Sequence, residues 1–217
     1  GFIMGKLWVI GCGFCTPTVN HADSTAWPYM LFDKLKLMGM VNSKMIDGQG
    51  SRDLQTIIDI FLKLLPDIKK EDYVILSLPP PRWRIPLDNE TLFVGNTGFD
   101  EGMVKYLEED VSRISYYLSP VLSKKGTEFN KIMKILGYSN AVKLNHIELL
   151  KSFKKYFPFR LEYFSWREYW DDCGSFIHTK KRITEKVGYW ETQSENDVHW
   201  SKNYHSSFTE YMIEELL

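Results

Sequence analysis

The sequence predicts an α/β fold, a parallel sheet of about five strands with helices on both faces. Residues 7–10 and 73–78 are short apolar runs with the length and composition of strands buried on both sides of a sheet. Residues 54–65, between them, carry apolar side chains at helical spacing. Strands that alternate with helices along a chain pair in parallel, because each helix returns the chain to the same end of the sheet. A single domain with this architecture is therefore expected.

The first strand is expected to run into a tight turn. Gly11-Cys12-Gly13 follows it directly, and glycine tolerates the backbone angles that such a turn requires. A helix over residues 27–37 is expected next, because Pro28 suits a first helical turn and Gly39 suits a helix end.

Two more strands and one helix complete the predicted first half of the chain. Residues 40–42 are a short second strand, and the glycine-rich residues 47–51 form a loop that leads into the helix over 54–65. The third strand covers residues 73–78. It stops at Pro79-Pro80-Pro81, because proline lacks the N–H that a central strand donates.

The second half of the chain is expected to begin with a helical insertion. We expect one domain over residues 1–217, with this insertion around residues 87–155. Apolar periodicity and composition predict an irregular stretch at 87–96, helices over 104–122, 128–136 and 141–153, a fourth strand over 159–164 and a closing helix over 208–217.

The composition excludes several classes of protein. The 217 residues include 27 basic and 28 acidic side chains, a net charge of −1, so no nucleic-acid partner is expected. A hydrophobic content of 44% is enough for a buried core. No apolar run is long enough for a membrane span or a signal-peptide core, so we expect a soluble protein without membrane contact, cytoplasmic or virion-associated in a host cell. Met4 is a plausible natural start behind residues 1–3.

The cysteines are Cys12, Cys15 and Cys173, an odd number that fits a reducing compartment. Cys12 and Cys15 form a CxxC pair. A zinc site needs a second ligand pair, and a redox site needs a thioredoxin-like setting, whereas Cys173 stands alone. The sequence favours neither use, so we expect no metal and no other cofactor.

Ligands of parallel sheets bind beyond the carboxyl ends of the strands. This rule selects the loops that begin at Gly11, near Asn42, at Pro79 and after Phe164. A polar cluster before the last helix is the candidate partner of these loops. In it, Asp197 stands two residues before His199, and a carboxylate so close can orient the imidazole and stabilise its charged form. The alternative is a loop histidine with a helix-capping aspartate.

Two glycine-rich turns are candidate anion sites, Gly11-Cys12-Gly13 and Gly48-Gln49-Gly50. The first is either a simple tight turn or a set of backbone amides for an oxyanion or a phosphate. The second leads into a helix that Ser51 or Asp53 can cap, and its exposed amides also suit anion binding. The first turn lacks both the GxGxxG spacing and the GKS/T ending, so nucleotide binding is poorly supported.

Several blocks of the sequence resemble the SGNH, or GDSL-type, hydrolases, in particular the phage and marine subset whose first motif is Gly-Cys-Ser-Phe-Thr. The blocks are residues 6–14, Trp27-Pro28, Asn42 with residues 48–57, residues 73–78 with Arg82-Trp83, and residues 197–211. The resemblance implies a flavodoxin-like three-layer fold and hydrolysis of acyl or acetyl esters, with a small-molecule or glycan ester as substrate. It also implies His199 as general base, Asp197 as its orienting partner, and the amides of Gly13 and Gly50 as oxyanion donors.

The sequence departs from this family at the nucleophile. Gly13 occupies the serine position and Cys15 the threonine position, so the expected hydroxyl is absent, and the glycine is either natural or a replaced serine. Cys12 and Cys15 are the remaining nucleophile candidates, because a thiol at a helix N-terminus can have its pKa lowered. The alternative is that both are small buried side chains. The asparagine of the third block is also missing from residues 77–82.

Basic and aromatic residues supply the candidate substrate contacts, which are Arg82, Trp83, Trp166, Trp170 and Trp200. The tryptophans after residue 165 either line a sugar-binding cleft or belong to the core. Three functions stay open. The protein is an ester hydrolase acting on acylated carbohydrate, with weak, cysteine-based or lost activity, or an inactive relative that binds a glycan or a protein, or a phage virion or assembly component.

Overall fold

The computed structural model describes residues 3–12, 15, 26–48, 52, 54–79, 82–87, 90–95, 138–189, 191–194 and 197–217. The chain divides into two compact units. The first contains Gly1–Arg52, Thr56–Pro79 and Lys151–Leu217, and the second contains Asp53–Gln55 and Pro80–Leu150. The expectation of one domain with an insertion stays a prediction.

The first unit is built on a four-stranded parallel sheet in the order β2-β1-β3-β6. The strands are β1 (Gly5–Gly11), β2 (Val41–Gly48), β3 (Tyr73–Ser77) and β6 (Arg160–Phe164). The predicted α/β class is confirmed, as are the strands expected at 7–10, 73–78 and 159–164. Beside β6, the described chain adds one parallel bridge between Phe164 and His178 in place of an expected fifth strand.

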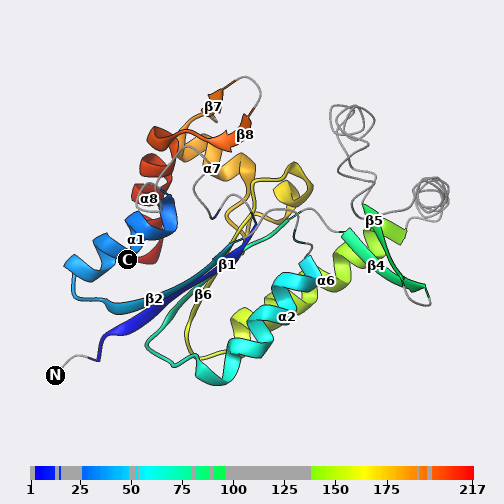
Figure 1. The fold of residues 1–217 in the computed structure, drawn as a ribbon, viewed down its shortest axis with the longest axis horizontal. Coiled ribbons are helices and arrows are strands. Elements are labelled where there is room, and N and C mark those ends of the chain that lie inside the picture. The colour runs from blue at the N-terminus through cyan, green and yellow to red at the C-terminus, as the bar shows by residue number, and fades with distance from the viewer. Residues whose placement is uncertain are drawn as a thin grey trace. The chain divides into compact units, whose positions relative to one another are not determined.

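Helices cover both faces of this sheet (Figure 1). α1 (Trp27–Leu37) and α8 (Lys202–Leu216) lie on one face, and α2 (Leu54–Leu64), followed by the short 3-10 helix η3 (Leu65–Asp67), lies on the other. α1 has Pro28 in its first turn, as predicted. Gly39 follows the end of α1 with a φ of 73°, a conformation that suits glycine.

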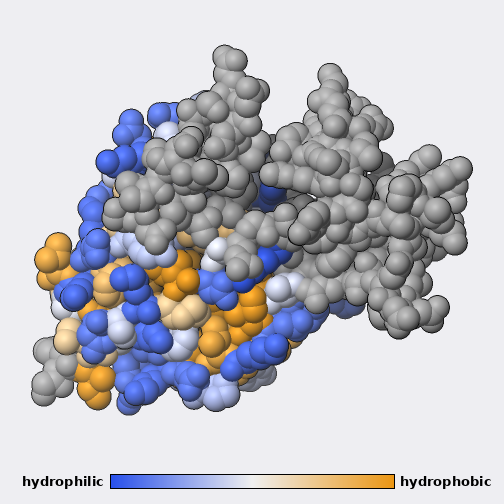
Figure 2. Space-filling view, viewed as in Figure 1, coloured by the Kyte–Doolittle hydropathy of each residue, from blue (hydrophilic) through white to orange (hydrophobic). Residues whose placement is uncertain are grey.

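Apolar layers fill the space between the sheet and its helices. Leu7 and Val9 of β1 belong to the same buried cluster as Trp27 and Leu31 of α1. On the opposite face, Phe61 of α2 lies at the centre of an aromatic cluster. Its ring centroid is 5.5, 5.6 and 6.3 Å from those of Phe153, Phe157 and Phe159. Figure 2 shows apolar residues in this region, between the sheet and α2.

β2 is longer than the strand predicted over 40–42. It pairs with β1 from Val41 to Gly48, so its carboxyl end lies at Gly48 and not near Asn42. Most of its side chains are exposed or half-buried, because β2 is the edge strand of the sheet. It therefore lacks the continuous apolar run that marks a central strand.

The polar, aromatic stretch between β6 and α8 contains several ordered elements. They are η4 (Glu168–Cys173), α7 (Lys180–Val187), β7 (Thr192–Ser194) and β8 (Asp197–Trp200). α8 begins at Lys202, ahead of the predicted start at residue 208. The reason is a cap, because the Ser201 hydroxyl accepts a hydrogen bond from the N–H of Tyr204 at 3.1 Å.

The second unit contains a hairpin where the sequence predicted an irregular stretch. β4 (Arg82–Leu87) and β5 (Glu90–Gly95) pair in antiparallel register. α6 (Tyr138–Tyr156) confirms the helix predicted over 141–153. The helices predicted over 104–122 and 128–136 lie outside the described residues. Among the helices that are described, none combines the length and the apolar character needed to cross a membrane.

Candidate active site

The strands of the sheet end together at the edge where parallel sheets bind ligands. Gly11, the last residue of β1, pairs with Gly48, the last residue of β2. Ser77 ends β3 and pairs with Phe164, which ends β6. The loops expected after β1, β3 and β6 begin at this edge, and the loop assigned to Asn42 begins after Gly48 instead.

Two cysteines and a serine meet where β1 and β3 end. The N–H of Cys15 donates to the carbonyl of Cys12 at 3.0 Å, which closes a tight turn directly after β1. Cys12 Sγ and Ser77 Oγ lie 3.6 Å apart, and the Ser77 hydroxyl also hydrogen-bonds the Cys15 thiol. The fold thus brings both predicted nucleophile candidates to one serine at the carboxyl edge of the sheet.

Gly11 is required by the packing of this cluster. A Cβ on residue 11 would lie 2.4 Å from Cys15 Sγ and 2.5 Å from Ser77 Cβ. Both distances are far below van der Waals contact, so no larger residue fits between these two side chains without a shift of the structure.

Arg52 places a positive charge beside the cysteines and ties β1 to β2. Its Nη2 lies 2.7 Å from Asp47 Oδ1. Its Nη1 donates to the carbonyl oxygens of Asp47 at 2.9 Å and of Gly11 at 3.3 Å. The side chain is only 11% exposed, so the guanidinium is held in place. No local sequence pattern points to Arg52, because nothing near it shows that its side chain contacts a strand end 41 positions earlier.

The two thiols differ in their access to solvent. Cys15 is fully buried, and this burial together with the nearby Cys12 raises the pKa of Cys15 well above its usual value. The hydrogen bond with Ser77 and the charge of Arg52 act in the opposite direction and do not outweigh burial. Cys12 is partly exposed. Of the two candidates, Cys12 is therefore the thiol that an external molecule can reach.

Asp197 and His199 lie in β8, where the backbone is described. Trp200, the last residue of β8, contacts Phe164 at the end of β6, with ring centroids 6.5 Å apart. β8, the strand that carries the predicted acid/base pair, thus ends beside the carboxyl end of β6. Cys12 follows the carboxyl end of β1, on the same side of the sheet.

The other predicted site residues are placed in part. Gly13 and Gly50, the predicted oxyanion donors, lie outside the described residues. Arg82 and Trp83 lie in β4 of the second unit. Their roles stay predictions. Within the described part of the chain, no group of three or more histidine, cysteine, aspartate or glutamate side chains is arranged to hold a metal ion.

Trp166, Trp170 and Trp200 are buried, with exposed fractions of 3%, 0% and 0%. Trp166 packs edge-on against Trp200 at a centroid separation of 4.8 Å, and Trp170 Nε1 donates to the carbonyl of Pro79 at 3.1 Å. The expectation that these rings line a sugar-binding cleft is therefore corrected. They fill the core around the end of β6, and protein atoms cover the faces on which a sugar would stack.

His205, which follows the predicted acid/base pair in the sequence, has a structural role. It is 2% exposed, and its Nδ1 accepts a hydrogen bond from the backbone N–H of Trp27 at 3.1 Å. Trp27 is the first residue of α1, so the imidazole satisfies a helix N-terminal donor that has no partner within the helix.

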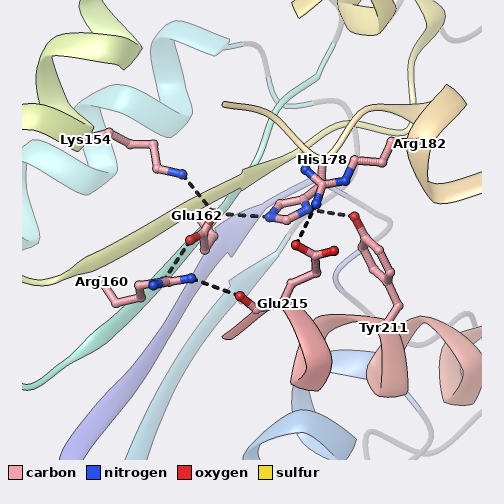
Figure 3. A network of polar contacts seen from close by, with 7 residues as sticks. All are labelled: Lys154, Arg160, Glu162, His178, Arg182, Tyr211 and Glu215. Atoms are coloured by element: carbon pink, nitrogen blue, oxygen red, sulfur yellow. Dashed lines mark hydrogen bonds and ion pairs between the residues drawn. The ribbon is translucent and has the colours of Figure 1, made fainter. Parts of the chain in front are cut away.

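A second polar cluster lies on β6 and is drawn in Figure 3. The Glu162 carboxylate accepts from Lys154 Nζ at 2.9 Å, Arg160 Nε at 2.8 Å and His178 Nε2 at 3.1 Å. His178 Nδ1 lies 2.7 Å from the hydroxyl of Tyr211 on α8. Glu162, His178 and Tyr211 are 6%, 4% and 5% exposed. Because both ring nitrogens of His178 have partners and the ring is buried, this cluster joins β6 to α8 and offers no open catalytic base.

No protein-family model matches the sequence, and no curated protein matches it. Among solved structures, the chain is similar to one described as a member of the lipolytic protein G-D-S-L family from Veillonella parvula DSM 2008. The similarity covers 96% of each chain, at 10% sequence identity and a TM-score of 0.41. A likeness at this level assigns neither a family nor an activity to the chain.

Proposed function

We propose that the protein is an ester hydrolase of the SGNH type that uses Cys12 as its nucleophile and acts on an acyl or acetyl ester of a carbohydrate. The observation that carries the proposal is the partly exposed Cys12 thiol directly after β1, beside Ser77 and close to the Arg52 guanidinium. The resemblance of residues 197–211 to the last block of that family supports the choice of acid/base pair.

The electrostatic setting supports a thiol nucleophile. Arg52 donates to the carbonyl of Gly11, the residue that directly precedes Cys12. Arg52 therefore fixes a positive charge beside the turn that carries the proposed nucleophile. The same charge lowers the pKa of the neighbouring Cys15, although burial dominates there.

In the proposed mechanism, His199 takes the proton of Cys12, and Asp197 orients the imidazole and stabilises its charged form. The thiolate attacks the ester carbonyl carbon, and the negative charge moves to the carbonyl oxygen, where the amides of Gly13 and Gly50 are the proposed donors. Collapse of the tetrahedral intermediate breaks the ester bond, and the alcohol leaves with the proton held by His199. Water, deprotonated by His199, then hydrolyses the thioester and restores the thiol.

Replacement of the nucleophile is the direct test. Cys12→Ala is expected to lower kcat/KM for a short-chain aryl acetate by a factor on the order of 100 or more, because the covalent step is lost. Cys15→Ala is the matched control, since it makes the same change on the buried thiol, and its kcat/KM is expected to stay within a few-fold of the parent value. Initial rates are measured in the presence of a reductant, with circular dichroism to verify that each variant is folded.

Two further variants separate the alternatives. His199→Ala is expected to lower turnover by a factor of about 100 to 10,000, as loss of a general base does. Full activity in Cys12→Ala or His199→Ala contradicts the proposed mechanism. If the parent chain shows no ester hydrolysis and Gly13→Ser does, the site lacks only the nucleophilic hydroxyl. No ester hydrolysis in either the parent chain or Gly13→Ser would favour an inactive binding or assembly role.

A further inference from the structure

The CxxC pair after β1 has the backbone geometry of a dithiol that can close into a disulfide. The hydrogen bond from Cys15 N–H to the carbonyl of Cys12, at 3.0 Å, defines a four-residue turn. The first and last Cα atoms of such a turn lie less than about 7 Å apart. Disulfides span Cα separations of about 4.4–6.8 Å, so bond formation requires little movement of the backbone.

Both cysteine sulfurs lie close to the hydroxyl of Ser77, so the two side chains point toward the same position. Cys12 Sγ lies 3.6 Å from Ser77 Oγ, and the same hydroxyl hydrogen-bonds the thiol of Cys15. The charge of Cys12 also contributes to the raised pKa of Cys15, as expected for sulfurs that are close together. Cysteine side chains that pointed away from each other would not share a hydroxyl partner, and one would not raise the pKa of the other.

The two thiols are suited to different steps of a thiol–disulfide exchange reaction. Cys12 is partly exposed and can attack an external disulfide. Cys15 is fully buried and can be reached only from within the protein. Arg52, which donates to the carbonyl of Gly11, places a positive charge beside this turn. Cys173 lies in η4, with its Sγ 3.4 Å from Asp172 Oδ1, and serves as an internal control.

We propose that Cys12 and Cys15 form a reversible intrachain disulfide by exchange with a low-molecular-weight disulfide such as oxidised glutathione. The Cys12 thiolate attacks one sulfur of that disulfide, forms a mixed disulfide and releases one glutathione thiolate. The Cys15 thiol then attacks the Cys12 sulfur of the mixed disulfide, and its proton passes to the second glutathione as that thiolate leaves. The cysteine pair loses two electrons, and one glutathione disulfide is reduced to two thiols. This inference depends on the cysteine geometry and goes beyond the proposed hydrolysis; where both hold, the disulfide blocks the proposed nucleophile.

The experiment measures the oxidation state of each cysteine. The reduced full chain is equilibrated without oxygen in buffers of increasing oxidised-to-reduced glutathione ratio, then unfolded in iodoacetamide and mapped by peptide mass spectrometry. Alkylation of Cys12 and Cys15 is expected to fall together, with one internal disulfide and no bound glutathione, while Cys173 stays alkylated. Dithiothreitol is expected to restore both thiols.

Single variants test the division of roles. Cys15→Ser is expected to stop the reaction at a stable glutathione adduct on Cys12, whereas Cys12→Ser is expected to leave Cys15 unmodified until the protein unfolds. The inference is overturned by a stable glutathione adduct on Cys12 in the parent chain, by pairing with Cys173 or between chains, or by full alkylation at the most oxidising ratio. The parent result decides alone where a variant fails to fold. Because the measurement is a mass and not a turnover number, absence of ester hydrolysis does not affect it.

Discussion

Glu162→Gln is expected to lower the free energy of unfolding by about 3 kcal/mol at pH 7. The side chain of Glu162 is 7% exposed, and its carboxylate accepts hydrogen bonds from Lys154, Arg160 and His178 (Figure 3). The side chains of Lys154 and Arg160 are 30% and 49% exposed and can turn toward water, but the side chain of His178 is 5% exposed and cannot. The glutamine amide carries no charge and presents its own N–H donors, so at least one of the three donors loses its acceptor.

The pKa of Glu162 sets the size of this effect. Burial alone would raise that pKa, but hydrogen bonds from His178 and Lys154, together with the charges of Lys154 and His178, lower it from 4.5 to about 2. At roughly 1.4 kcal/mol for each pH unit, this difference corresponds to about 3 kcal/mol of preference for the charged form in the folded chain. Glutamine resembles the neutral form and therefore loses that preference.

The pH dependence of stability follows from the direction of this shift. Because the pKa of Glu162 is lower in the folded chain than in the unfolded chain, the carboxylate stabilises the fold above pH 4.5, and its contribution is lost as the pH falls toward 2. The difference between the parent and Glu162→Gln is therefore expected to be full at pH 7 and to shrink progressively below pH 4.5. Urea denaturation at several pH values between 3 and 7 measures it.

Glu210→Gln is the matched control for this prediction. It makes the same chemical change in the ion pair of Lys34 and Glu210, whose side chains are 43% and 56% exposed. Exposed pairs contribute about 0–1 kcal/mol, so this variant is expected to stay close to the parent at every pH. Equal losses in the two variants, or a Glu162→Gln difference that does not change with pH, would contradict the role assigned to the network.

The buried strands of the sheet were predictable from the sequence, and its edge was not. β1 and β3 are almost wholly buried, so their apolar runs are continuous. β2 lies at the edge, where most side chains are exposed or half-buried, and its pairing with β1 defines its length. An apolar run in the sequence indicates that a segment is buried. Such runs therefore locate strands that are buried on both faces and miss strands that backbone pairing alone stabilises.

Only the local part of the candidate site was predictable for the same reason. The turn with Cys12 and Cys15 follows the first strand in the sequence, so its place at the edge of the sheet could be predicted. Ser77 and Arg52 meet this turn from 65 and 41 positions away, and no local pattern contains that information. Composition likewise shows that the tryptophans are large and apolar, but it does not show that they are covered in the folded chain.

Gly11→Ala is expected to destabilise the protein by about 3 kcal/mol and to disturb the cysteine pair at the same time. The new Cβ would meet Cys15 Sγ at 2.4 Å and Ser77 Cβ at 2.5 Å. Cys15 is fully buried and has little space into which its sulfur can turn, and Ser77 Cβ is bound to the backbone of a buried strand. To remove this steric overlap, β1 must move away from β3, or the turn between Cys12 and Cys15 must open. Urea denaturation measures the first effect, and the rate of Cys15 alkylation in the folded protein measures the second.

Gly174→Ala provides the matched control for that change. Nothing lies within 4 Å of a Cβ at residue 174, and its backbone angles, φ −64° and ψ −6°, are ones that alanine adopts without strain. This variant is expected to be neutral or up to about 1 kcal/mol more stable, because alanine restricts the unfolded chain more than glycine does. An increase in Cys15 alkylation confined to Gly11→Ala would locate the strain at the strand end. Stability and alkylation that stay at parent values in Gly11→Ala would mean that this edge accommodates a side chain, and the close packing assigned to the cysteine turn would be wrong.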